Sequence, residues 1–178
     1  MTLCRARKFG SVILGTDKSH GPECMSIIKS ALFMGYRIID TAQAYGNETE
    51  IGQAIRETDI HRDDVFLITK VSSGWKRNPS TASDAYDSVQ RSLDRLGVSY
   101  LDLCLIHSPG ADASARMATW QGLEKLYRGG FVKSIGVSNF GIGHLRELLA
   151  YTSIGLPSVN QIEGSYCSWL ALKSNEEY

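Results

Sequence analysis

The sequence lacks any long apolar run and any excess of one charge. No segment approaches the roughly 18 consecutive apolar residues that a membrane-spanning helix requires, so we expect no such helix. The 178 residues include nineteen basic and nineteen acidic side chains. This balance gives no sign of a nucleic-acid partner, because nucleic-acid-binding proteins usually carry a basic excess. Hydrophobic residues make up 43% and charged residues 21%, the composition of an ordinary globular protein.

Paired cysteines are also missing. No Cys-x-x-Cys pair is present, which predicts reduced, mostly buried thiols in a cytoplasmic protein. The four scattered cysteines are Cys4, Cys24, Cys104 and Cys167. Residues 1–8 hold three basic side chains and no acid, a pattern that a transit peptide can share. This segment is short and runs into an apparent strand, so we do not expect a targeting role.

Two further binding signatures are absent. His20, His61 and His144 have no partners at metal-ligand spacing, so we expect surface histidines and no metal site. No Gly-x-Gly-x-x-Gly follows an apolar run, which argues against a Rossmann dinucleotide site.

The sequence does contain a regular alternation of strand and helix patterns. Short apolar runs predict strands at residues 11–16, 36–40, 64–70, 100–107, 132–138 and 158–163. Apolar residues at helical spacing predict helices at 23–34, 48–57, 81–96, 115–128 and 143–150. The third helix opens on a Thr81-x-x-Asp84 capping pattern. The fourth helix is expected to bury Trp120, Leu123, Leu126 and Tyr127.

This alternation predicts an α/β fold with parallel strands and helices outside them. Equal units of roughly thirty residues favour a (β/α) barrel over an open sheet. A complete eight-unit barrel typically needs about 250 residues, whereas this chain supplies about six units. We therefore expect a partial (β/α)8 TIM barrel.

Polar side chains follow the predicted strands at their C-terminal ends. Asp40 ends the second strand and Tyr45 lies in the loop after it, while Lys70 ends the third strand and His107 the fourth. Adjacent strand ends of a parallel barrel converge on one mouth, so we expect these side chains to meet. Asn47 is expected to cap the helix that follows Tyr45.

These four residue types suit proton transfer to a carbonyl group. A phenol is a weak acid near neutral pH, and an ammonium group nearby favours its ionised form. An aspartate would hold the lysine charged and in place, and an imidazole can hydrogen-bond a substrate carbonyl. The set therefore predicts a proton donor for a carbonyl oxygen, next to a source of hydride.

These residues and their surroundings resemble the aldo-keto reductases. The resemblance covers about residues 10 to 163 and rests on separate motifs in the family's order. These are the stretch from Gly35 to Glu48 with its Ile-Asp-Thr-Ala and Tyr-Gly-Asn-Glu, the Ile-Thr before Lys70, the Leu-Ile before His107, Ser92-Leu93-Asp94-Arg95-Leu96-Gly97, Tyr100-Leu101-Asp102-Leu103, Gly136-Val137-Ser138-Asn139-Phe140 and Val159-Asn160-Gln161-Ile162-Glu163.

The resemblance implies an NAD(P)H-dependent oxidoreductase that reduces an aldehyde or ketone to an alcohol. It implies catalytic roles for Asp40, Tyr45, Lys70 and His107, with Tyr45 as the proton donor. It implies that the nicotinamide carboxamide is held by Ser138, Asn139 and Gln161, and that the cofactor is also bound by Gly15, Thr16 and Asp40. The substrate carbonyl would meet His107, and Trp75 would wall its pocket.

After Glu163 the sequence departs from the family pattern. The family continues with two β/α units, which carry an aromatic that stacks on the nicotinamide and the loop that binds the 2′-phosphate of NADPH. We find no counterpart in residues 164–178, so the chain resembles a C-terminally truncated member. We therefore expect an incomplete barrel over residues 1–163, a divergent tail over 164–178, and open outer strands that favour self-association. NADPH is the expected cofactor and NADH the alternative.

Three functions stay open at this point. The chain can be a working reductase, an inactive remnant that has lost cofactor affinity, or a non-catalytic binding or regulatory subunit with this fold. Saturable NADPH binding, a folded chain without nucleotide binding, and stable co-purification with a partner would distinguish them. Single residues also have plainer interpretations: Lys70 as a solvated lysine, His107 as a structural histidine, and Ser138-Asn139 as a helix cap.

Overall fold

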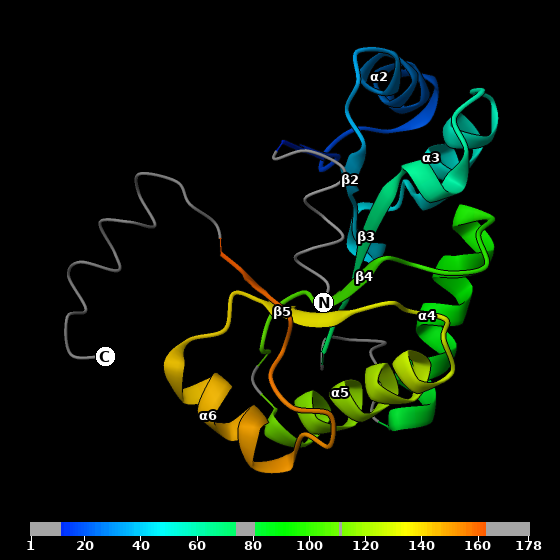
Figure 1. The fold of residues 1–178 in the computed structure, drawn as a ribbon. Helices are drawn as coiled ribbons and strands as arrows, with labels where there is room; N and C mark the ends of the chain where they lie inside the picture. The colour runs from blue at the N-terminus through cyan, green and yellow to red at the C-terminus, as the bar shows by residue number, and fades with distance from the viewer. Residues whose placement is uncertain (1–11, 74–80, 111, 163–178) are drawn as a thin grey trace, which may run out of the picture.

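The chain forms one six-stranded parallel sheet in the computed structural model, which describes residues 12–73, 81–110 and 112–162 (Figure 1). The strands lie across the sheet in chain order, and every neighbouring pair is parallel. They are β1 (Ile13–Gly15), β2 (Ile38–Asp40), β3 (Phe66–Val71), β4 (Leu103–Ile106), β5 (Ile135–Ser138) and β6 (Asn160–Gln161). Parallel neighbours need a crossover connection, which explains the helix between each pair.

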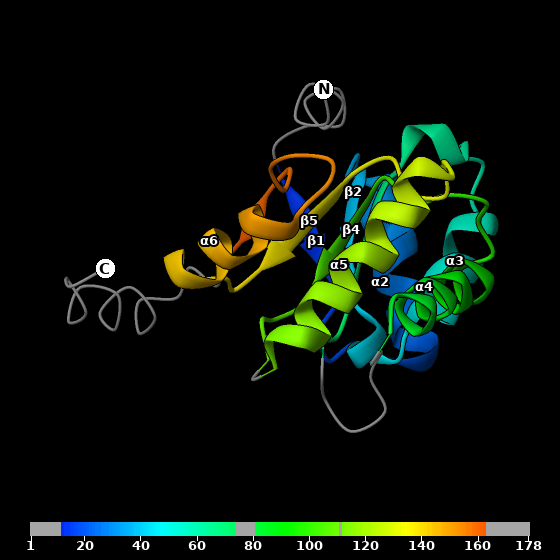
Figure 2. The same cartoon turned by 90° about the horizontal axis from the view of Figure 1, so that it is seen from below.

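Five α-helices within the described ranges supply these crossovers. They are α2 (Gly21–Phe33), α3 (Glu48–Arg56), α4 (Ala82–Leu96), α5 (Ala113–Arg128) and α6 (Ile142–Tyr151), and two 3-10 turns, η1 (Gln43–Tyr45) and η2 (Arg62–Asp64), precede α3 and β3. The helices follow one another in an arc along the outer side of the sheet, and α3, α4 and α5 lie side by side (Figures 1 and 2). The sheet is curled, and the predicted partial (β/α)8 barrel is confirmed.

The apolar core has two layers, because side chains alternate between the two faces of each strand. The inner face carries a small cluster made of Ile38, Phe66, Ile68, Leu103 and Leu105. The outer face carries the intervening side chains, which pack with the helices in a larger cluster that includes Ile39, Leu67, Ile106 and Trp120. Positions two residues beyond the inner cluster therefore point toward the mouth of the barrel.

The strands are shorter than their apolar runs suggest. The run predicted at 100–107 contributes only Leu103–Ile106 to the sheet, because Leu101 forms an isolated bridge with Val132. An apolar run reports burial, whereas a strand requires continuous backbone pairing with a neighbour. The two therefore differ at the ends of the runs.

The sequence predicted side-chain caps at the starts of two helices, and the structure confirms one prediction and contradicts the other. The hydroxyl of Thr81 accepts from the amide of Asp84 at 3.1 Å, and the Asp84 carboxylate accepts from the Thr81 amide at 2.9 Å, as the capping pattern predicts. Asn47 does occupy the N-cap position directly before α3, but its side chain makes no capping hydrogen bond. The prediction for Tyr127 is also wrong, since it is 43% exposed. The neighbouring Leu126 fills the core position, and the next residue on a helix turns by about 100°.

Candidate active site

Three of the predicted catalytic side chains follow from strand alternation. Asp40, Lys70 and His107 each come two residues after a member of the inner apolar cluster. Side chains two residues apart on a strand share one face, so these three extend the inner face beyond its apolar part. The register pairs Asp40 with Ile68 and Lys70 with Leu105, so the three polar residues are staggered by two residues from one strand to the next, as the tilted strands of a barrel require.

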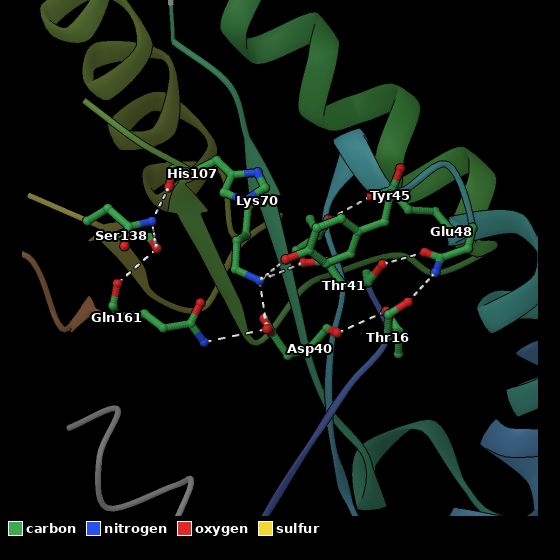
Figure 3. Close-up of polar contacts among 12 residues, drawn as sticks. Thr16, Asp40, Thr41, Tyr45, Glu48, Lys70, His107, Ser138 and Gln161 are labelled. Carbon is green, nitrogen blue, oxygen red and sulfur yellow. Dashed lines mark hydrogen bonds and ion pairs between the residues drawn. The ribbon is translucent and has the colours of Figure 1, made fainter. Parts of the chain in front are cut away.

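Lys70 lies at the centre of the polar contacts in Figure 3. Its Nζ donates to Asp40 Oδ2 at 2.6 Å, to the carbonyl oxygen of Thr41 at 3.3 Å and to Tyr45 Oη at 3.4 Å. The lysine side chain is 3% exposed and the aspartate side chain 12%. The interpretation of Lys70 as a solvated lysine is therefore wrong: the charge is buried and paired, as buried charges must be.

Tyr45 reaches Lys70 from the turn η1. Its ring lies edge-on to that of His107, with the centroids 5.6 Å apart and the planes at 84°. The Lys70 Nζ lies 5.1 Å from the centroid of the Tyr45 ring. Asp40, Tyr45, Lys70 and His107, here called the tetrad, thus form one contiguous group, as the sequence predicted.

His107 is half-buried above this group. Burial and, next, the ammonium of Lys70 lower the pKa of His107 below its ordinary value of 6.5, while the carboxylates of Asp40 and Asp17 act in the opposite direction. The imidazole is therefore neutral at pH 7. A neutral imidazole offers one N–H donor and one acceptor.

A second polar group lies beside the tetrad, at the ends of β5 and β6. The hydroxyl of Ser138 donates to the carbonyl oxygen of Gln161 at 2.9 Å, and the Asn139 amide donates to Ser138 Oγ and to the His107 carbonyl oxygen at 3.2 Å each. Gln161 Nε2 makes a long contact of 3.5 Å with Asp40 Oδ2. The helix-cap interpretation of Ser138-Asn139 is wrong, because α6 is capped at Gly141.

The end of β1 completes this edge of the sheet. Gly15 pairs with Asp40 in the register, and the buried Thr16 donates its hydroxyl to the Asp40 carbonyl oxygen at 3.0 Å. The side chain of Asn47, predicted to cap α3, instead donates to the carbonyl oxygens of Thr16 and Ser19 at 2.8 and 2.9 Å. It therefore fastens the loop after β1 to the loop that holds Tyr45.

Some predicted residues are not placed by the structure. Trp75, the residues of the predicted tail 164–178, and Cys4 and Cys167 lie outside the described residues. The other two cysteines, Cys24 and Cys104, are buried free thiols, as predicted.

Sequence reasoning missed two residues near the tetrad. Gln43 anchors the turn η1 to helix α4. Glu48 is 2% exposed and accepts a hydrogen bond from Thr69, the residue before Lys70, at 2.7 Å. Their positions next to the Tyr45 motif were visible in the sequence, but nothing local indicated where their side chains point.

Two absences concern the described residues alone. Within residues 12–73, 81–110 and 112–162, no group of three or more His, Cys, Asp or Glu side chains is arranged to hold a metal ion. Over the same ranges, each helix is too short or too polar to cross a membrane.

The chain matches the model of the Aldo/keto reductase family over residues 8–176. Among curated proteins it is 42% identical to glyoxal reductase of Bacillus subtilis over 151 residues, which are 84% of this chain and 52% of that protein. The chain spans about half the length of the curated relatives it matches.

Solved structures show the same likeness. An aldo/keto reductase of Brucella melitensis superposes with a TM-score of 0.79 at 36% identity, over 93% of this chain and 64% of that one. A Bombyx mori aldo-keto reductase in complex with NADP superposes with a TM-score of 0.75 at 32% identity, over 85% of this chain and 53% of that one.

Proposed function

Because the chain belongs to the aldo/keto reductase family, we propose that it reduces an aldehyde or ketone to an alcohol with Tyr45 as the proton donor. The supporting observation is the position of the Lys70 ammonium, which lies between the Asp40 carboxylate at 2.6 Å and the Tyr45 hydroxyl at 3.4 Å. A buried cation next to a phenol can stabilise the negative charge that develops on the phenolic oxygen during proton transfer. Asp40 holds that cation in place, so the phenol is prepared for proton transfer before a substrate arrives.

His107 supports this assignment through its charge state. Its lowered pKa leaves the imidazole neutral at pH 7, and a neutral imidazole is a poor source of a proton. Its N–H can still hydrogen-bond a carbonyl oxygen and orient it toward the edge-on Tyr45 ring. We assign orientation of the carbonyl to His107 and donation of the proton to Tyr45.

The mouth also fits a nicotinamide cofactor, NADPH or NADH, which supplies a hydride when it is bound. Asp40 Oδ1 is buried and has no hydrogen-bond partner among the described residues, so it can accept from a ligand hydroxyl. Ser138, Asn139 and Gln161 carry a hydroxyl and two amides, the donors and acceptors that a carboxamide requires. The NADP complex of the Bombyx mori relative supports this choice of cofactor.

The test measures cofactor binding and turnover separately. NADPH is titrated into the purified chain while tryptophan fluorescence is recorded, and the fall in NADPH absorbance is then followed with glyoxal, the substrate named for the Bacillus subtilis relative. Tyr45→Phe should lower turnover by about 100-fold or more, the usual contribution of a general acid. NADPH affinity should stay unchanged, because the ring remains.

Tyr127→Phe is the matched control, since Tyr127 is 43% exposed and lies on α5. It should retain the wild-type rate. Undiminished turnover in Tyr45→Phe would refute the assigned proton donor. A folded wild-type chain that binds neither NADPH nor NADH would refute the reductase proposal and favour the inactive remnant.

A further inference from the structure

The side chain of Gln43 joins the turn that carries Tyr45 to helix α4. Its amide Nε2 donates to the carbonyl oxygen of Ser88 at 3.0 Å and to Ser92 Oγ at 2.8 Å. Its Oε1 accepts from Ser88 Oγ at 3.1 Å. One side chain, two residues before Tyr45, thus makes three hydrogen bonds across a gap of more than forty residues in sequence.

Among the described residues, the backbone hydrogen bonds of the turn η1 do not reach α4. The amide of Tyr45 bonds to the carbonyl oxygen of Ala42 at 3.0 Å, and that of Gly46 to the carbonyl oxygen of Gln43 at 3.3 Å. Both bonds close the turn on itself and fix nothing outside it. The Tyr45 ring is half-exposed and its contact with Lys70 is long, at 3.4 Å, so the ring position depends on where the turn is held.

Hydrogen bonds also connect Ser92 on α4 to strand β3, next to Lys70. Ser92 is buried and accepts from Arg95 at 3.1 Å, and Arg95 Nε donates to Glu48 Oε2 at 2.7 Å. The other oxygen of Glu48 accepts from Thr69, which directly precedes Lys70, at 2.7 Å. One polar network therefore fixes the Tyr45 turn and the end of β3 to the same helix.

We propose that Gln43 is a positioning residue that holds Tyr45 within reach of the Lys70 ammonium through its three bonds to α4. The effect of Gln43 on catalysis rests on the function proposed above. Its effect on the position of the Tyr45 turn does not depend on that function. Within the described part of the chain, the side chain of Gln43 bonds to Ser88 and Ser92 on α4 and not to the tetrad, so it acts through the turn and not on a substrate.

The test replaces Gln43 by Met, which keeps the length of the side chain and removes its hydrogen bonds. Amide hydrogen exchange is read residue by residue with a ¹⁵N-labelled chain. Exchange at Tyr45 and Gly46 should rise roughly tenfold, the effect of losing one or two net hydrogen bonds. Amides in the interior of β3 should keep their wild-type rates, which distinguishes a loosened turn from general destabilisation.

Two further variants test whether the change in exchange is specific to the hydrogen bonds of Gln43. Gln53→Met is the matched control, because Gln53 is exposed and its side chain donates to Glu57 at the end of its own helix. Its exchange at Tyr45 and Gly46 should stay within about twofold of wild type, as expected for a surface change. Gln43→Glu keeps the acceptor for Ser88 and should restore part of the protection.

In turnover assays, Gln43→Met should lower kcat by a similar factor and leave KM for the carbonyl unchanged. Unchanged exchange at Tyr45 and Gly46 in Gln43→Met would overturn the proposal, whether or not the chain turns over. If amide exchange is faster in Gln43→Met but the wild-type chain shows no turnover, the positioning contact is upheld and the reductase function is refuted. The failure of one proposal is therefore distinguishable from the failure of the other.

Discussion

Gly52 sets how closely α3 can approach α4, and adding one methyl group there should destabilise the protein. A Cβ built on Gly52 would lie 2.1 Å from the carbonyl oxygen of Leu96 and 2.5 Å from its carbonyl carbon. Ordinary van der Waals contact begins at 3.4 Å, so the methyl group is about 1.3 Å too close to rigid backbone. The same carbonyl oxygen accepts from Arg56 at 2.9 Å, a bond that any separation of the helices would stretch.

Two opposing contributions to the free energy of unfolding are expected in Gly52→Ala, one from helix propensity and one from overpacking. Replacing Gly by Ala inside a helix stabilises it by up to about 1 kcal/mol through propensity. Overpacking a close contact costs about 1–3 kcal/mol and sometimes more, and an obstacle made of backbone leaves little room for relaxation. We expect Gly52→Ala to lower the free energy of unfolding by about 2 kcal/mol.

Urea unfolding followed by tryptophan fluorescence measures this change, with the m-value as the check that both states keep their compactness. Gly143→Ala is the matched control, because a Cβ on Gly143 in α6 would meet no atom within 4 Å. That variant should be as stable as wild type or more stable by up to about 1 kcal/mol. A Gly52→Ala protein as stable as wild type would refute the reasoning.

Two other predictions concern charges in the mouth. Lys70→Met leaves the Asp40 carboxylate buried without its 2.6 Å partner and should cost roughly 3–5 kcal/mol in urea unfolding. Lys29→Met breaks an exposed pair and should leave the urea midpoint close to that of wild type. Equal losses of stability in the two variants would contradict the assigned burial of the Lys70–Asp40 pair. The pKa of His107 is lowered by burial and Lys70 against the opposing Asp40 and Asp17 carboxylates, so the unfolded chain binds more protons below pH 6.5. Stability should therefore fall as the pH drops from 6.5, and His107→Gln should show a shallower fall between pH 7.5 and 5.5.

The proposed chemistry depends on a buried charge that the fold must support. A lysine that is 3% exposed is tolerated only with hydrogen-bonding partners, and Asp40, Thr41 and Tyr45 supply them. The same three partners fix the ammonium where the phenol can use it. The stability of the protein and the proposed catalysis therefore both depend on the same buried ammonium group. For this reason Lys70→Met is expected to lower both the free energy of unfolding and the rate of turnover.

The sequence by itself determined the order of the elements and which side chains share a face. The spacing of Ile38 and Asp40, and of Ile68 and Lys70, shows that each polar residue continues an apolar inner face. The Thr81 capping pattern likewise predicted the start of α4. These features are local, because the geometry of one strand or one helical turn fixes them.

Only the tertiary structure decided which atoms meet. Asn47 has the character of a helix cap, yet its amide is used by the loop after β1. Gln43 gave no sign that it would reach Ser92 across forty-nine positions. Such contacts depend on the register and curl of the sheet and on how closely α3 and α4 pack. Those are set by the whole core, so no short stretch of sequence contains them.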